Sequence, residues 1–191
     1  MPEFDLPEEM RYLPWRRLFL FQEAVSDLSG AVMSFDLDLL ITGPIDELFD
    51  YMPDSKFLTI ENWNQMGQGI GNISVFRFNI GELPEIWNGF RADPLGMRAK
   101  YGNSQTYISR TLGEFDYFPP EWCLSYKHSI IPRWPLNFFK SPELPTNARV
   151  IAFTGKPDID EDARGEWPVT RWYKRLYKFV RPAPWLLDHW R

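Results

Sequence analysis

The stretch AVMSFDLDLLITGP, residues 31–44, decides the expected fold. Residues 31–35 form a short apolar run that is typical of a buried strand. Residues 39–41 extend this run until a Gly-Pro pair ends it. Asp36 and Asp38 lie two positions apart, so in an extended chain both carboxylates point to the same side. Carboxylates at the end of a buried strand suit a hard divalent cation in an α/β fold. We therefore expect Asp36 and Asp38 to bind a metal ion.

Strands and helices alternate along the rest of the chain. The expected strands are 56–60, 72–78 and 149–153, and in 72–78 the side chains alternate between two faces. The expected helices are 83–90 and 104–112, the second with Ser104 as its cap. Such an order of elements predicts an α/β layer architecture.

Composition limits the classes of function. The 191 residues are 44% hydrophobic with a net charge of −5, which predicts a folded domain and argues against nucleic-acid binding. Residues 164–191 nevertheless carry seven Lys or Arg against two acids. The single cysteine, Cys123, excludes an internal disulfide and a Cys-based zinc site, and it fits a cytoplasmic location.

Two further motifs receive structural interpretations. Residues 158–162 have the aspartate spacing of a calcium loop, but Ala163 replaces the required turn glycine, so we expect a solvated loop. Residues 67–71 contain three glycines but precede a strand instead of a helix, unlike a dinucleotide loop. We expect them to form a tight turn or to approach a ligand closely.

The segment from Ser34 to Phe49 resembles the metal-binding strand and turn of GT-A-fold glycosyltransferases, especially the glycogenin-like and bacterial lipopolysaccharide sugar transferases. Three later stretches resemble further family motifs in the expected order. These are the strand 72–78 that lines the sugar site, residues 103–105 at a helix start, and the late loop 153–157 that contacts metal and diphosphate. The resemblance covers roughly residues 15–157.

The resemblance implies a fold, a cofactor and a set of site residues. The fold is a GT-A-like mixed sheet flanked by helices, and the cofactor is Mn²⁺ or Mg²⁺ on Asp36 and Asp38. The implied catalytic residues are Gln105 and Asn103, and the implied substrate-binding residues are Asn72, Ser74, Gly155 and Lys156.

The chain departs from the family pattern at three places. The loop 153–157 lacks the usual histidine, which leaves Asp36, Asp38, substrate phosphates and water as metal ligands, and Asn103 stands where an aspartate is common. Only 35 residues precede Asp36, too few for the family's nucleotide-binding half. We therefore expect an N-terminally incomplete domain over residues 1–165, followed by a basic aromatic tail over 166–191.

The implied function is metal-dependent transfer of a sugar from a nucleotide-sugar donor to a glycan or lipid-linked acceptor. Departures from the family pattern leave a second interpretation open, a degenerate and non-catalytic domain that binds a partner or a glycan through its aromatic surface.

The tail allows two interpretations of its own. Residues 169–180 have the spacing of an amphipathic helix, and we expect Trp172, Leu176 and Phe179 to be buried against the domain. The alternative is that the interleaved aromatic and basic residues make peripheral contact with the inner face of a membrane.

Overall fold

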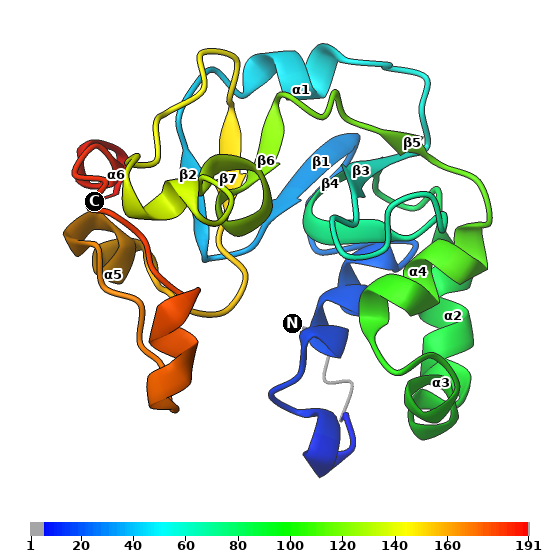
Figure 1. Cartoon of the computed structure of the whole chain (residues 1–191). Helices are drawn as coiled ribbons and strands as arrows, with labels where there is room; N and C mark the ends of the chain where they lie inside the picture. Colours follow the sequence, from blue (N-terminus) through cyan, green and yellow to red (C-terminus); the bar gives the residue numbers. More distant parts are fainter. Residues whose placement is uncertain (1–5, 191) are drawn as a thin grey trace. The chain divides into compact units, whose positions relative to one another are not determined.

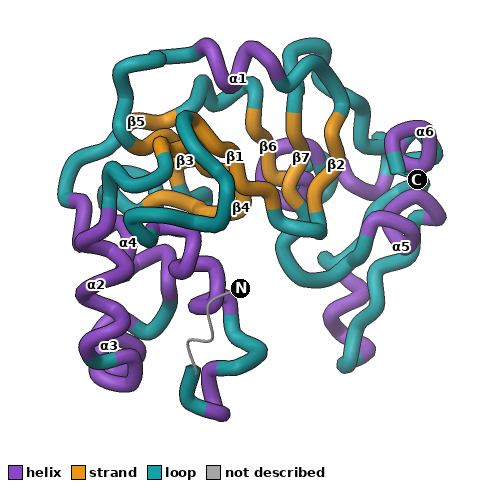
Figure 2. Tube along the Cα trace, turned by 180° about the vertical axis from the view of Figure 1, so that it is seen from behind, coloured by secondary structure: helices purple, strands orange, loops and turns teal. Residues whose placement is uncertain are grey.

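The computed structural model describes residues 6–190, which form two compact units. The first unit contains residues 6–34 and 49–118, and the second contains 35–48 and 119–190. Each unit has its own sheet (Figures 1 and 2). Each also has its own apolar core. The expected class, α/β with mixed sheets flanked by helices, is confirmed. The expected division at residue 165, between a domain and a basic aromatic tail, stays a prediction.

The four-stranded sheet of the first unit has the order β1-β4-β3-β5. Its strands are β1 (Ala31–Phe35), β3 (Phe57–Glu61), β4 (Gly71–Asn79) and β5 (Asp116–Tyr117). β3 pairs antiparallel with β4 and parallel with β5. β1 is a strand as expected, but the expectation that it is buried is wrong. It lies at the sheet edge with Ala31 exposed and its other side chains only half-buried, because an edge strand has a neighbour on one side.

Helices cover this sheet with an aromatic core between the layers. They are the 3₁₀ helices Glu8–Met10 and Pro14–Phe21 and the α-helices α2 (Pro84–Ala92), α3 (Pro94–Tyr101) and α4 (Ser104–Leu112). Trp15 stacks on Phe90 with ring centroids 5.4 Å apart, and Phe21 contacts Phe78 at 4.6 Å. Such aromatic pairs add about 1 kcal/mol each beyond the area that they bury, so they fix the helices on the sheet.

The second unit has a three-stranded sheet of order β2-β7-β6, visible as three neighbouring strands in Figure 2. The strands are β2 (Leu39–Ile41), β6 (Cys123–Ser125) and β7 (Val150–Ala152). β7 pairs antiparallel with β2 and parallel with β6. Residues 39–41 therefore do not extend β1 as expected. Residues 37 and 38 form a bend after Phe35, and the chain then enters a different sheet.

The remaining elements are short. They are α1 (Asp46–Asp50), α5 (Ile159–Arg164), α6 (Leu186–His189), the π-helical turn Tyr126–Ile130 and the 3₁₀ turns Leu136–Phe138 and Trp172–Leu176. Among residues 6–190, none of the helices combines the length and apolar character needed to cross a bilayer.

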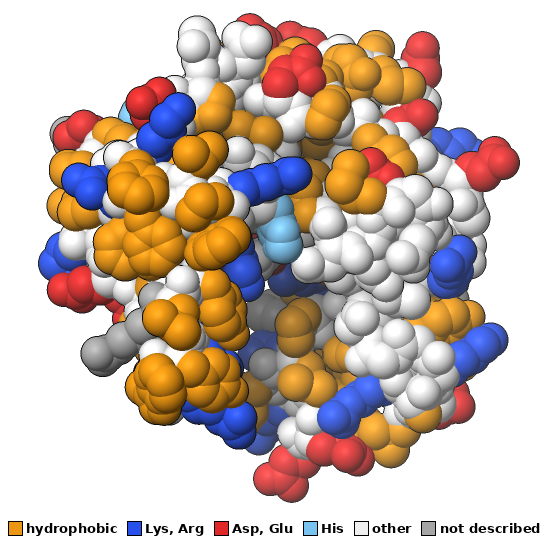
Figure 3. All heavy atoms as spheres, in the orientation of Figure 1, with side chains coloured by type: hydrophobic (Ala, Val, Ile, Leu, Met, Phe, Trp, Pro, Cys, Tyr) orange, Lys and Arg blue, Asp and Glu red, His pale blue; other side chains and the backbone are white. Residues whose placement is uncertain are grey.

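The helix expected over 169–180 is reduced to one 3₁₀ turn. The end of this segment is instead bonded to residues 137–142. The Asn137 side chain donates to the Phe179 carbonyl, and the side chains of residues 181 and 185 donate to the carbonyls of residues 138 and 142. The expected burial of Trp172 and Leu176 is wrong, because packing of the tail uses Phe179 instead, and they are 78% and 65% exposed. Figure 3 shows hydrophobic side chains gathered at the left and lower left, where the second unit lies.

Candidate functional site

The segment Asp36–Asp38 connects β1 to β2. The carbonyl of Asp38 accepts a hydrogen bond from the Phe153 amide at 3.0 Å, which continues the β2–β7 ladder by one residue. The side chain of Asp36 is half-buried and that of Asp38 is exposed. Because the segment bends, the two carboxylates do not follow the extended geometry that the sequence suggested.

A cavity of about 420 Å³ opens beside Asp38 in the second unit. It brings together Asp38 and Gly155, two predicted site residues that lie far apart in the sequence. The other residues that line it are Leu37, Phe153, Asp158, Ile159, Asp160 and Trp190. Trp190 was expected as one of the interleaved aromatic residues of the tail and not as a site residue, since nothing in the sequence places it beside Asp38.

Gly155 allows the chain to turn sharply after β7. Its φ of 71° lies in the region that favours glycine, and a Cβ built there would have no heavy atom within 4 Å. The turn requires glycine for its backbone angle, while the space beside it stays open to the cavity.

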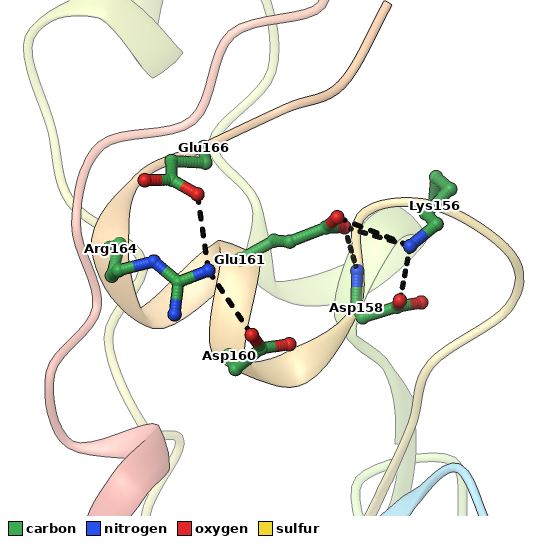
Figure 4. A network of polar contacts seen from close by, with 6 residues as sticks. All are labelled: Lys156, Asp158, Asp160, Glu161, Arg164 and Glu166. Atoms are coloured by element: carbon green, nitrogen blue, oxygen red, sulfur yellow. Dashed lines mark hydrogen bonds and ion pairs between the residues drawn. The ribbon is translucent and has the colours of Figure 1, made fainter.

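Lys156 follows this turn and contacts the start of α5 (Figure 4). Its ammonium forms an ion pair with Asp158 and a second with Glu161 at 3.1 Å. These two carboxylates raise the pKa of Lys156, so the group stays protonated. The positive charge predicted for the diphosphate is therefore engaged by carboxylates in this conformation.

Residues 158–162, expected to be a solvated loop, belong to α5 and its cap. Asp158 and Glu161 form a capping box, in which each side chain accepts a backbone N–H at the helix start. Asp160 is paired with Arg164 one turn later at 3.1 Å, as Figure 4 shows. The sequence did contain this signal, because an aspartate followed three positions later by a glutamate is a helix-start pattern.

Asp162 points into the core of the second unit. Its side chain is completely buried, and neither carboxylate oxygen has a hydrogen-bond partner among the described residues. Burial, followed by the charges of Glu161 and Asp158, raises the pKa of this carboxyl to about 8. Because its pKa is raised in this way, Asp162 is protonated at neutral pH. The hydroxyl of buried Tyr126 also lacks a partner within the described part of the chain.

Asn72 and Ser74 lie in a bulge of β4. The register with β3 slips between Thr59, opposite Phe76, and Ile60, opposite Asn72, so regular alternation of faces over 72–78 is not observed. The Thr59 hydroxyl lies 2.7 Å from the carbonyl of Asn72, and the Asn72 side chain accepts from the Ser74 amide at 2.9 Å. The bulge leaves Ser74 half-exposed in an otherwise buried stretch, and such bulges are common beside active sites.

Asn103 and Gln105 lie at the start of α4. Asn103, not Ser104, is the N-cap, because its side chain accepts the Thr106 amide at 2.9 Å while Ser104 is buried. The Gln105 side chain is half-exposed on the first turn. Asn103 thus has a structural role, the capping of α4.

The ligand chemistry suits a cation only in part. Among residues 6–190, no group of three or more His, Cys, Asp or Glu side chains could hold a metal. Asp38 lines the cavity and Asp36 lies two residues before it. Carboxylate oxygens suit Mg²⁺ or Mn²⁺, which accept oxygen ligands from phosphates and water as well. The residues fit a cation that binds together with a diphosphate.

Comparisons with known proteins show similarity in fold. No protein-family model and no curated protein matches the sequence. The glycosyltransferase GlyE of Streptococcus pneumoniae TIGR4 superposes with a TM-score of 0.52 at 15% identity, over 76% of this chain and 38% of GlyE. The galactosyltransferase LgtC, solved with donor and acceptor sugar analogs, gives a TM-score of 0.48 at 19% identity, over 76% of this chain and 59% of LgtC. An active-site mutant of LgtC gives a TM-score of 0.48 at 17% identity, over 80% of this chain and 63% of the mutant chain.

The chain thus has a glycosyltransferase-like α/β fold, and it spans less than two thirds of the length of each of these solved chains.

Proposed function

We propose that the chain belongs to a glycosyltransferase that transfers a hexose from a nucleotide-sugar donor to a glycan or lipid-linked acceptor. The observation that supports this most is that Asp38 and Gly155, from two remote motifs, line one cavity in a protein with a glycosyltransferase-like fold. The main-chain bond between Asp38 and Phe153 fixes their spacing.

Asp36 and Asp38 would hold Mn²⁺ or Mg²⁺ together with the donor diphosphate. When bound, the cation would neutralise the negative charge that develops on the departing diphosphate. Asp38 is exposed and Asp36 only half-buried, so both side chains reach solvent. The open space beside Gly155 would let a phosphate oxygen approach the backbone closely.

Lys156 would add positive charge to this end of the donor. Its ion pairs with Asp158 and Glu161 are exposed, and such pairs contribute little net stability. A diphosphate with its higher charge could therefore compete for the ammonium group.

The predicted roles of the first unit's residues stay proposals. Asn72, Ser74 and Gln105 would orient the donor sugar through hydrogen bonds, with the bulge in β4 holding the first two. Asn103 would act chiefly by capping α4 and so placing Gln105.

Calorimetric titration of Mn²⁺, with a nucleoside diphosphate present, tests the metal site. Asp36→Asn and Asp38→Asn should each weaken Mn²⁺ binding at least tenfold, because each substitution removes one charged ligand. Asp160→Asn is the matched control, because Asp160 lines the same cavity but is paired with Arg164. Equal affinities for all four proteins would exclude the assignment.

A panel of nucleotide sugars, assayed for transfer and for donor hydrolysis, tests the reaction. The second candidate, a non-catalytic domain, is favoured by the lack of a three-residue metal-ligand group within residues 6–190. Diphosphate binding without turnover of any donor would support that candidate. Metal-dependent turnover that Asp38→Asn abolishes would support the transferase.

A cytoplasmic location remains our expectation. Cys123 is buried within β6, where burial raises its thiol pKa to about 12, so it is unreactive and fits a reducing compartment. Fractionation of cells that express a tagged chain would test this location.

A further inference from the structure

A cavity of about 790 Å³ in the first unit has no part in the function proposed above. It opens where β3 begins, beside the start of α2, the end of α4 and the strand β5, all of which lie in the same part of this unit (Figure 1). None of the residues that line it also lines the cavity beside Asp38. An occupant of this cavity would therefore not depend on sugar transfer.

The side chains that line this cavity are mostly acidic. Five carboxylates face one lysine, Lys56, and they belong to Asp54, Glu82, Glu85, Glu114 and Asp116. Asp116 is half-buried and the other four acids are exposed, and within residues 6–190 none of the five forms an ion pair. Their charge repels anions such as nucleic acid and acidic headgroups, and it attracts cationic groups.

The carboxylates are spread over the cavity wall. In the described part of the chain, no three acidic side chains come close enough to hold a metal ion, so the wall suits several separate cationic groups better than one ion. Phe115 and Tyr117 add two half-buried rings that meet edge to face at 5.3 Å. Rings of this kind accept the aliphatic stem of a lysine or arginine and attract its charge. The lining therefore favours long cationic side chains.

The strand β5 forms one edge of the four-stranded sheet. It pairs with β3 on one side, where the Phe118 amide donates to the Thr59 carbonyl at 2.9 Å. Alternate residues of a parallel strand present their main-chain groups to the same neighbour, so the amide and carbonyl of Tyr117 point to the outer side. Among residues 6–190, neither of these two groups has a hydrogen-bond partner. An unpaired edge thus adjoins the acidic cavity, because Asp116 and Tyr117 belong to both.

We propose that this edge and cavity bind a basic segment of a partner protein, which docks as an extended strand along β5. Its main chain would pair with the outer edge at Tyr117. Its lysine or arginine side chains at alternate positions would enter the cavity together, because alternate side chains of a strand lie on the same face. Main-chain bonds give such an added strand affinity, and side-chain pockets give it specificity.

Fluorescence anisotropy with a labelled peptide tests the docking on the whole chain. The peptide has about seven residues, capped ends, and lysine alternating with threonine. It should bind, the same peptide with glutamate in place of lysine should not, and binding should weaken steeply as salt is raised.

Methylation of peptide amides separates strand pairing from charge attraction. Only one alternate set of amides can face β5, so methylating that set should weaken binding at least tenfold, while methylating the other set should leave binding nearly unchanged. Both methylated peptides keep every positive charge, and each is therefore the control for the other.

Variants of the chain test the acidic lining. Asp116→Asn and Glu114→Gln should each weaken peptide binding about threefold, as expected for the loss of one charge pair near the surface, and the double variant about tenfold. Asp27→Asn is the matched control, because Asp27 is an exposed acid of the first unit that does not line the cavity. Circular dichroism of every variant verifies that the fold is kept.

Several outcomes would show the proposal to be wrong. One is that the lysine peptide does not bind. Another is equal affinity for the parent peptide and both methylated peptides, which would leave charge as the only cause of binding. Spermine that binds as tightly as the peptide would make a small polyamine the occupant. Self-association of the wild type that Asp116→Asn abolishes would make a second copy of the chain the occupant.

Discussion

Replacing Asp162 by asparagine should stabilise the protein and remove part of its pH dependence. The carboxyl is completely buried, and its pKa is about 8 in the folded state against an ordinary value of 3.8. Below pH 3.8 it is protonated in both states and has no effect on stability. Between about pH 4 and 8 the unfolded chain releases the proton while the folded chain keeps it, so stability falls as pH rises.

The size of the effect follows from the shift in pKa. At pH 7 the difference between 7 and 3.8 corresponds to a ceiling of about 4 kcal/mol, at 1.36 kcal/mol per unit. An asparagine at this position still buries polar atoms, which costs on the order of 2 kcal/mol. We therefore expect Asp162→Asn to gain about 2 kcal/mol at pH 7 and less at pH 5.

Urea denaturation at pH 5, 7 and 8 measures this difference. Asp160→Asn is the matched control, since Asp160 is on the same helix but is exposed and paired with Arg164. Its effect should be small and nearly constant over this range. A gain on Asp162→Asn that does not change with pH, or a loss at every pH, would show that Asp162 is not a buried proton-binding group.

Two further predictions concern stability. Arg77 is buried and donates to the carbonyls of residues 49, 51 and 52. Arg77→Met should therefore lower the free energy of unfolding by about 3 kcal/mol in urea denaturation. Arg91→Met, at an exposed position, should be nearly neutral. Gly165 and Gly113 both end helices with positive φ, but only at Gly165 would a Cβ lie within 3 Å of Pro182. Gly113→Ala should lower stability by about 1 kcal/mol and Gly165→Ala by at least about 2, and equal losses would contradict this.

The elements that the sequence predicted well have strong local signals. β1, β3 and β7 come from short apolar runs, and α4 is delimited by residues with capping chemistry on one side and Gly113 on the other. The separation of β2 from β1 could not be predicted, because apolar residues continue on both sides of Asp36 and Asp38. Only the pairing of Leu39–Ile41 with β7, about 110 residues later, determines that the chain changes sheets.

The site was predictable where motif order carried the information. Asp38 and Gly155 were placed together by family resemblance, and both line the cavity of the second unit. The engagement of Lys156 by Asp158 and Glu161 depends on α5, which was expected to be a loop. Trp172 is exposed because Phe179 is the tail residue that packs against the segment 137–142. Helical periodicity alone does not show which aromatic residue of the tail makes that contact.

The hydrogen bond between the Asp38 carbonyl and the Phe153 amide has a consequence for engineering. It joins the connection after β1 to the end of β7 through backbone atoms, so side chains at positions 36 and 38 can be exchanged without removing this bond. Folded members of a library randomised at these two positions should therefore keep it. Such a library could be selected for other ions or for neutral ligands, with the core residues of β2 and β7 left unchanged.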